Sequence, residues 1–171
     1  MDPSDGFVYV QGARDVKSFR IKTIAEPLVW RFRAALEKAA GDIALSLPAF
    51  DRFPRGCCGD ASDLLARYLL ESGIRTSGVL GTFRTGDFED IQTHMWLIDE
   101  DDLIIDVTGD QFRHNPLLLN FSKTVYYGPE DDFHRLFEID RHGICVGEFE
   151  RYGSIARDSL AGAYDVLRRH L

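Results

Sequence analysis

Three side chains in this sequence are of the types that attack an acyl carbon. They are Cys58, His94 and Asp106, separated by 36 and 12 residues. A cysteine thiolate becomes a working nucleophile when a base stands beside it, and a histidine oriented by a carboxylate is such a base. The chemistry therefore depends on whether the fold brings three distant segments together.

Residues 56–73 place a cysteine at the start of a predicted amphipathic helix. Apolar side chains recur at the helical spacing of three to four residues, at Leu64, Leu65, Tyr68 and Leu69. Gly73 suits the C-terminal cap, and Asp60 lies in the first turn, where a carboxylate favours the helix dipole. Unpaired backbone N–H groups at the helix start favour a thiolate at Cys58 over a thiol.

Residues 93–108 supply the candidate base and acid. They are predicted to form two short strands joined by an acidic turn at 99–102. His94 opens the first strand and Asp106 lies near the end of the second, so antiparallel pairing would bring them close across the ladder. The carboxylate would then orient the imidazole. Asp110 is the alternative acid.

These segments together resemble the transglutaminase-like branch of the papain-like thiol enzymes. That family's nucleophile helix has the form G-x-C-x-D-x-A-x-L-L, followed by a glycine near the helix end. The register is matched by Gly56, Cys58, Asp60, Leu64, Leu65 and Gly73, with Ser62 at the small residue. The family's H-x-W motif is matched by residues 94–96 and its D-x-T motif by residues 106–108. Arylamine N-acetyltransferases share this order of Cys, His and Asp, and the resemblance covers residues 54–112.

The resemblance implies a papain-like/transglutaminase-like core, in which the nucleophile helix packs on an antiparallel sheet. It implies Cys58 as nucleophile, His94 as base and Asp106 as the orienting acid, with no cofactor or metal. Papain-like peptidases also use a glutamine upstream of the nucleophile to stabilise the oxyanion. No glutamine lies between Gln11 and Cys58. The Cys58 backbone N–H is a candidate donor, and a second donor is not assigned.

Each of these residues also has a plainer interpretation. A cysteine at a helix start is often only a small buried hydrophobe, and His94 could be a core histidine with satisfied hydrogen bonds. Cys57 is the rival nucleophile, although its use would shift the family register by one residue. Cys145 is predicted to lie in the core of a strand. The remaining histidines, at 114, 134, 142 and 170, are predicted to be exposed.

The periodic segments predict helices first, then an antiparallel sheet, then a closing helix, which is an α+β pattern. Helical repeats occupy residues 26–47, with Pro27 in the first turn and Gly41 as a candidate end or kink before a second segment that reaches Leu47. A further repeat occupies residues 154–171, with Ser154 as cap. Strand-like segments lie at 7–10, 76–83, 93–108, 124–127 and 144–149. The loop at 48–55 leads into the cysteine helix, so we expect it to form one wall of a cleft.

Length and composition predict a single water-soluble domain over residues 1–171. The chain is 44% hydrophobic and 28% charged, and a chain of this size needs no disulfide or metal to hold its core. Its net charge of −8 disfavours nucleic acid or an anionic membrane as a partner. The three cysteines, two of them adjacent, make a poor disulfide framework. We therefore expect a cytoplasmic protein, or one exported without a classical signal peptide.

Taken together, these patterns predict a cysteine-dependent hydrolase or acyl or amide transferase that works through a thioester. Water as the second reactant would make it a protease or deamidase, and an amine would make it a transamidase. The expected partner is a peptide, a protein or a small amide or acyl compound. One alternative is an inactive papain-like domain that serves as a binding or regulatory module. Another is a bacterial effector that deamidates or modifies a host protein glutamine.

Overall fold

The computed structural model describes residues 11–85 and 91–171, and within them it has the predicted α+β architecture. The helices are α1 (Gln11–Ile43), α2 (Cys58–Glu71) and α3 (Ser154–Arg168). The strands are β1 (Ser77–Phe83), β2 (Gln92–Ile98), β3 (Ile104–Asp106), β4 (Tyr126–Gly128) and β5 (Glu138–Ile144). They form one antiparallel sheet in the order β4-β3-β2-β1-β5. The strand predicted at 7–10 lies outside the described residues.

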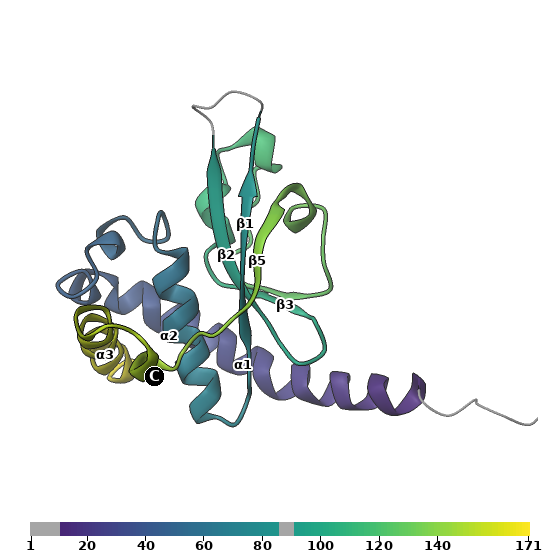
Figure 1. The fold of residues 1–171 in the computed structure, drawn as a ribbon, viewed down its shortest axis with the longest axis horizontal. Helices are drawn as coiled ribbons and strands as arrows, with labels where there is room; N and C mark the ends of the chain where they lie inside the picture. The colour runs from purple at the N-terminus through teal and green to yellow at the C-terminus, as the bar shows by residue number, and fades with distance from the viewer. Residues whose placement is uncertain (1–10, 86–90) are drawn as a thin grey trace, which may run out of the picture.

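The sheet is covered on both faces, by different kinds of structure. On one face lies a core built mainly from the three helices, which gather beside and beneath the strands in Figure 1. On the other face, side chains from the segment between β3 and β5 form a second, aromatic cluster with Phe112, Phe121, Phe133 and Phe137. β2 serves both clusters: Leu97 faces the helices while Trp96 and Ile98 face the aromatic cluster, as the two-residue period of a strand requires.

α1 begins well before the predicted start at residue 26, and Pro27 lies inside it. A buried stripe accounts for helix on both sides of Pro27, because Ala25, Val29 and Phe32 recur at helical spacing and are fully buried. A proline removes one backbone hydrogen bond, and packing of this stripe offsets that loss. α1 runs past Gly41, the candidate end or kink, and stops at Ile43, and the second segment predicted to reach Leu47 is not part of a helix.

The last strand is displaced from its predicted place at 144–149. β5 ends at Ile144, and the chain then leaves the sheet to lie against α2. The Gly147 backbone causes this departure: its N–H donates to Asp63 Oδ1 at 3.1 Å, and a Cβ there would stand 2.6 Å from the Arg67 backbone nitrogen. Cys145, predicted to be a core residue, is consequently exposed.

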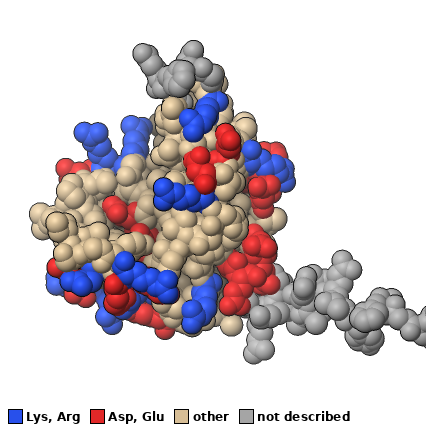
Figure 2. All heavy atoms as spheres, in the orientation of Figure 1, with Lys and Arg blue, Asp and Glu red and all other residues tan. Residues whose placement is uncertain are grey.

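The closing helix forms close to its predicted position, but Ser154 is not its cap. Gly153 occupies the cap position without a side-chain hydrogen bond, and Ser154 is the first helical residue. Within the described part of the chain, no helix has the length and apolar character needed to cross a membrane. Basic and acidic side chains are interspersed over the face shown in Figure 2.

The start of α2 is held against an open stretch of β2. β3 pairs with β2 only at Leu97 and Ile98, so the preceding residues of that edge have no strand partner there. α2 takes the vacant place: Ser62 Oγ donates to the Met95 carbonyl at 3.4 Å, and the Met95 backbone amide donates to the sulfur of Cys58. This arrangement sets the first residue of α2 beside His94, the neighbour of Met95.

Candidate active site

His94 and Asp106 form a buried pair, with 2.8 Å between His94 Nε2 and Asp106 Oδ2. The strand register accounts for the contact. Leu97 pairs with Ile105, so the next step of the ladder sets Trp96 opposite Asp106. His94 lies two residues from Trp96 on the same face, within diagonal reach of Asp106. The sheet therefore brings together His94 and Asp106, the predicted base and acid, which lie 12 residues apart in the sequence.

Asp106 is held as a carboxylate by contacts on both of its oxygens. Oδ1 accepts the Thr108 backbone N–H at 2.8 Å, while Oδ2 faces the His94 ring. Burial would raise the pKa of Asp106, but the charge of His94 and contacts with two imidazoles hold that pKa well below its usual range. Asp106 is thus ionised and fixed in orientation.

Aromatic side chains enclose the His94 ring. The rings of Phe112, Phe137, Trp96 and Phe133 lie with their centroids 5.2, 5.7, 5.7 and 6.0 Å from it. Burial alone would lower the pKa of His94, but the adjacent Asp106 carboxylate outweighs burial and raises that pKa to about 10. The enclosure therefore strengthens the pairing of His94 with Asp106 by excluding water.

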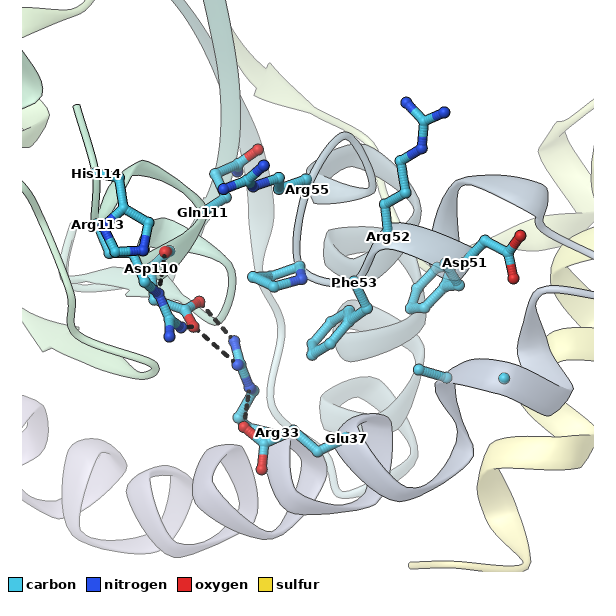
Figure 3. Close-up of a pocket in the computed structure, with 14 residues that line it drawn as sticks. Arg33, Glu37, Asp51, Arg52, Phe53, Arg55, Asp110, Gln111, Arg113 and His114 are labelled. Atoms are coloured by element: carbon cyan, nitrogen blue, oxygen red, sulfur yellow. Dashed lines mark hydrogen bonds and ion pairs between the residues drawn. The ribbon is translucent and has the colours of Figure 1, made fainter.

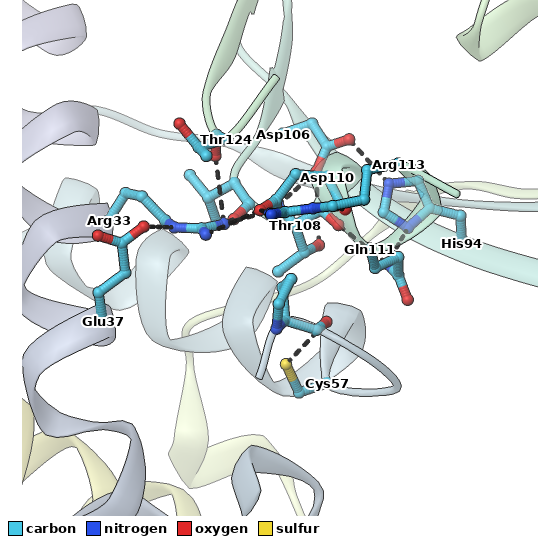
Figure 4. A network of polar contacts seen from close by, with 12 residues as sticks. Arg33, Glu37, Cys57, His94, Asp106, Thr108, Asp110, Gln111, Arg113 and Thr124 are labelled. Atoms are coloured by element: carbon cyan, nitrogen blue, oxygen red, sulfur yellow. Dashed lines mark hydrogen bonds and ion pairs between the residues drawn. The ribbon is translucent and has the colours of Figure 1, made fainter. Parts of the chain in front are cut away.

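The two adjacent cysteines have different environments. Burial raises the pKa of the Cys58 thiol, but a hydrogen bond with His94 and the charge of that ring outweigh burial, so the pKa is below its usual value. Cys57 is fully buried with its sulfur 3.2 Å from the Pro54 carbonyl, below the His94 and Gln111 side chains in Figure 4. Burial raises its pKa to about 12. Cys58, which is partly exposed, is therefore the more readily ionised thiol.

Gln111 is a member of the site that the sequence reasoning did not find. Its Nε2 lies 3.1 Å from His94 Nδ1, the ring nitrogen that Asp106 does not use. Two backbone groups fix the amide orientation, because Oε1 accepts the Gly56 N–H at 3.3 Å and Nε2 donates to the Thr108 carbonyl at 3.1 Å. Gln111 therefore donates to Nδ1 in this arrangement, which favours a neutral ring with its proton on Nε2. The sequence indicates this role only weakly, because Gln111 lies five positions after Asp106 and downstream of Cys58, whereas the expected glutamine lies upstream.

His134 is a second imidazole on the same carboxylate, and its predicted exposure was wrong. It is 1% exposed, and its Nε2 lies 3.4 Å from Asp106 Oδ2, an ion-pair distance without a well-formed hydrogen bond. Its Nδ1 is 2.6 Å from Asp131 Oδ1. Burial would lower the pKa of His134, but the contacts with Asp106 and Asp131 raise it. The aromatic cluster buries His134. The polar sequence around His134 has no periodicity that would predict this burial.

Asp110, the alternative acid, forms ion pairs with two arginines. Its Oδ1 and Oδ2 accept from Arg33 Nη1 and Nη2 at 2.8 and 3.0 Å, and Arg113 also pairs with Oδ2. Arg33 is itself 4% exposed and donates to the Val107 carbonyl at 2.6 Å. Figure 4 shows this line of contacts running from α1 toward the segment that carries Asp106. Asp110 therefore anchors the site to α1, while Asp106 contacts the imidazole.

Two cavities flank Gln111. One of about 550 Å³ lies between α1, the 50–55 loop and residues 110–114, as Figure 3 shows. The predicted wall is present, because Phe50, Phe53 and Pro54 line this cavity. The other, of about 470 Å³, has Gly56, Thr93 and Phe112 in its lining, whereas Cys58 and His94 line neither cavity. Within residues 11–85 and 91–171, no three His, Cys, Asp or Glu side chains cluster so as to hold a metal ion.

Comparisons with protein-family models, with curated proteins and with solved structures found no match to this chain.

Proposed function

We propose that this protein is a cysteine-dependent hydrolase or acyl or amide transferase with a papain-like/transglutaminase-like core. One observation carries the proposal: Cys58 is hydrogen-bonded to the His94 ring, and Nε2 of that ring is 2.8 Å from the buried Asp106. The α+β arrangement, with α2 packed along the sheet, is compatible with such a core. The substrate class would be a peptide, a protein or a small amide or acyl compound.

The Cys58 thiolate would attack the carbonyl carbon of the substrate and form a carbon–sulfur bond. His94 would give its Nδ1 proton to the departing amine or alcohol as the tetrahedral intermediate collapses to a thioester. Asp106 would keep the ring oriented and stabilise its positive charge throughout. The ring would then take a proton from water or an amine as that second nucleophile attacks the thioester and releases the Cys58 thiolate.

The first turn of α2 offers a donor for the developing oxyanion. Cys58 is the first residue of α2, and its backbone N–H is one of those that have no partner within the helix. Such a donor typically contributes a few kcal/mol of transition-state stabilisation. The proposal therefore assigns both the nucleophile and one oxyanion donor to the same residue.

A burst of acyl-enzyme formation tests this proposal. With 4-nitrophenyl acetate as an activated ester, we expect a burst of nitrophenol and an acetyl group on Cys58, detected by mass spectrometry of the peptides. Cys58→Ala should abolish the burst, and the matched Cys57→Ala variant should keep it. Acetylation of Cys57 or Cys145 at the same rate as Cys58 would contradict the assignment.

A non-catalytic module is the second candidate, and the position of Gln111 favours it. An amide that donates to His94 Nδ1 opposes protonation of that nitrogen, and so opposes the thiolate–imidazolium pair. In the enzyme, Gln111 must release Nδ1 when the pair forms. In a non-catalytic module the Gln111 amide would stay bonded to His94 Nδ1, and the wild-type protein would show no burst of nitrophenol.

A further inference from the structure

We infer that the acyl donor of Cys58 carries an anionic group, a carboxylate or a phosphate, which Arg55 binds where the two cavities meet. The inference rests on the proposed function and names the substrate class of the same site.

Arg55 is common to both cavities, together with Gln111 and His114. Gln111 is the residue that joins this region to the reacting groups, since its Nε2 lies 3.1 Å from His94 Nδ1. The loop that carries Arg55 is hydrogen-bonded to Gln111, because the N–H of the next residue, Gly56, donates to Gln111 Oε1 at 3.3 Å. A group bound at Arg55 would therefore stand close to the site of attack.

The inner wall of the larger cavity is already neutralised. Arg33 pairs with Glu37 at 2.8 Å and with Asp110, and Arg113 also pairs with Asp110. These two arginines and two carboxylates balance in charge. They offer a substrate no free cation, so the wall serves as a rigid support for the cavity.

Arg55 differs from these arginines. It is exposed, and no carboxylate among the described residues forms an ion pair with it. Asp51 and Arg52 belong to the same cavity lining, but Figure 3 shows them extending away from Gln111, whereas Arg55 lies beside it. The smaller cavity has no acidic side chain among its described lining residues. An unpaired guanidinium in a concave site is a suitable partner for a carboxylate or phosphate.

The charge of the whole chain makes a preference for anions at Cys58 testable. With a net charge of −8 the protein repels anions over long range. A preference for an anionic reagent at Cys58 therefore requires a local cation. The His94 ring supplies a background preference, so the contribution of Arg55 must be measured as a difference between variants.

Iodoacetate and iodoacetamide form the appropriate pair of probes. Each reacts when the Cys58 thiolate displaces iodide and forms a carbon–sulfur bond, and they differ mainly in charge. We expect Arg55→Ala to slow carboxymethylation of Cys58 by iodoacetate about fivefold at low ionic strength, with the iodoacetamide rate unchanged. Arg55→Lys should retain part of the preference. Arg141→Ala removes an exposed arginine of β5 outside both cavities, so it should leave the ratio of the two rates as in the wild type.

Protection experiments at constant ionic strength identify the anion. Slower alkylation in the presence of glutarate indicates a carboxylate, and slower alkylation with inorganic phosphate indicates a phosphate; either effect should vanish in Arg55→Ala. Equal rate ratios in Arg55→Ala and Arg141→Ala would overturn the anion site while leaving the proposed function intact. Failure of iodoacetamide to label Cys58 selectively in the wild type would instead overturn the proposed function.

Discussion

At the scale of single residues, reactivity is set by what surrounds each sulfur and each ring nitrogen. Cys57 and Cys58 are adjacent, yet burial raises the pKa of the first and the His94 contact lowers that of the second. Asp106 determines the state of His94 in turn, because a buried carboxylate at 2.8 Å favours the charged ring. The Asp106 carboxylate and the Cys58 sulfur therefore favour the charged His94 ring, while the Gln111 amide favours the neutral one.

The pairing of His94 with Asp106 predicts a pH dependence of stability that appears only when the thiol is removed. The pKa of folded His94 is raised to about 10 from 6.5, so its stabilisation is complete below about pH 6.5 and is lost as pH rises through about 10. The lowered pKa of Cys58 gives the opposite slope and masks this effect in the wild type. In Cys58→Ala the contribution of Cys58 to the raised pKa of His94 is lost, but the Asp106 contact still raises that pKa. The free energy of unfolding should therefore fall above pH 6.5 by up to about 1.4 kcal/mol per pH unit.

Urea titrations between pH 6 and 9 would measure that slope. Adding Asp106→Asn to Cys58→Ala should flatten it, because the amide no longer stabilises the charged ring. The double variant should also be less stable by about 3–5 kcal/mol near neutral pH, since a buried charged partner is removed. Equal slopes in the single and double variants would show that Asp106 does not set the pKa of His94.

At the scale of elements, the site depends on close backbone approach as much as on side chains. The start of α2 reaches His94 because β3 leaves part of the β2 edge unpaired. Gly109, which follows β3, passes against Asp106: a Cβ there would stand 2.6 Å from Asp106 Oδ2 and 2.6 Å from the Phe121 ring. Only glycine allows the chain to turn this closely around the carboxylate.

Gly109→Ala should therefore damage the site. The added methyl would push Asp106 away from His94, so we expect alkylation of Cys58 to slow by about tenfold or more. We also expect the protein to lose about 1–3 kcal/mol of stability from overpacking. The matched variant Gly41→Ala lies in α1, where nothing stands within 4 Å of the added atom. It should raise the melting temperature through helix propensity and leave alkylation unchanged. A Gly109→Ala protein as reactive and stable as the wild type would contradict the close packing around Asp106.

At the scale of the whole molecule, the sheet separates a helical core from an aromatic cluster, and the candidate site forms where both meet β2. Local patterns were enough to predict α2, the two strands that carry His94 and Asp106, and the α+β class. They failed where distant contacts decide the structure. The chain leaves the sheet after β5 because the Gly147 backbone packs on α2. His134 is buried by aromatic residues from other segments. Gln111 joins the site through Gly56 and Thr108. Neither periodicity nor spacing in the sequence contains those long-range contacts. The catalytic role of Cys58, His94 and Asp106 stays a prediction.

Activation of Cys58 by His94 can be measured as the rate of iodoacetamide alkylation as a function of pH. Peptide-level mass spectrometry would follow all three cysteines at once, with the exposed Cys145 as an internal reference. We predict that Cys58 is labelled fastest near neutral pH, with an apparent pKa below 9.0, and that His94→Ala slows it by about tenfold or more. Uniformly slow labelling of all three thiols, unchanged in His94→Ala, would contradict activation of Cys58 by His94.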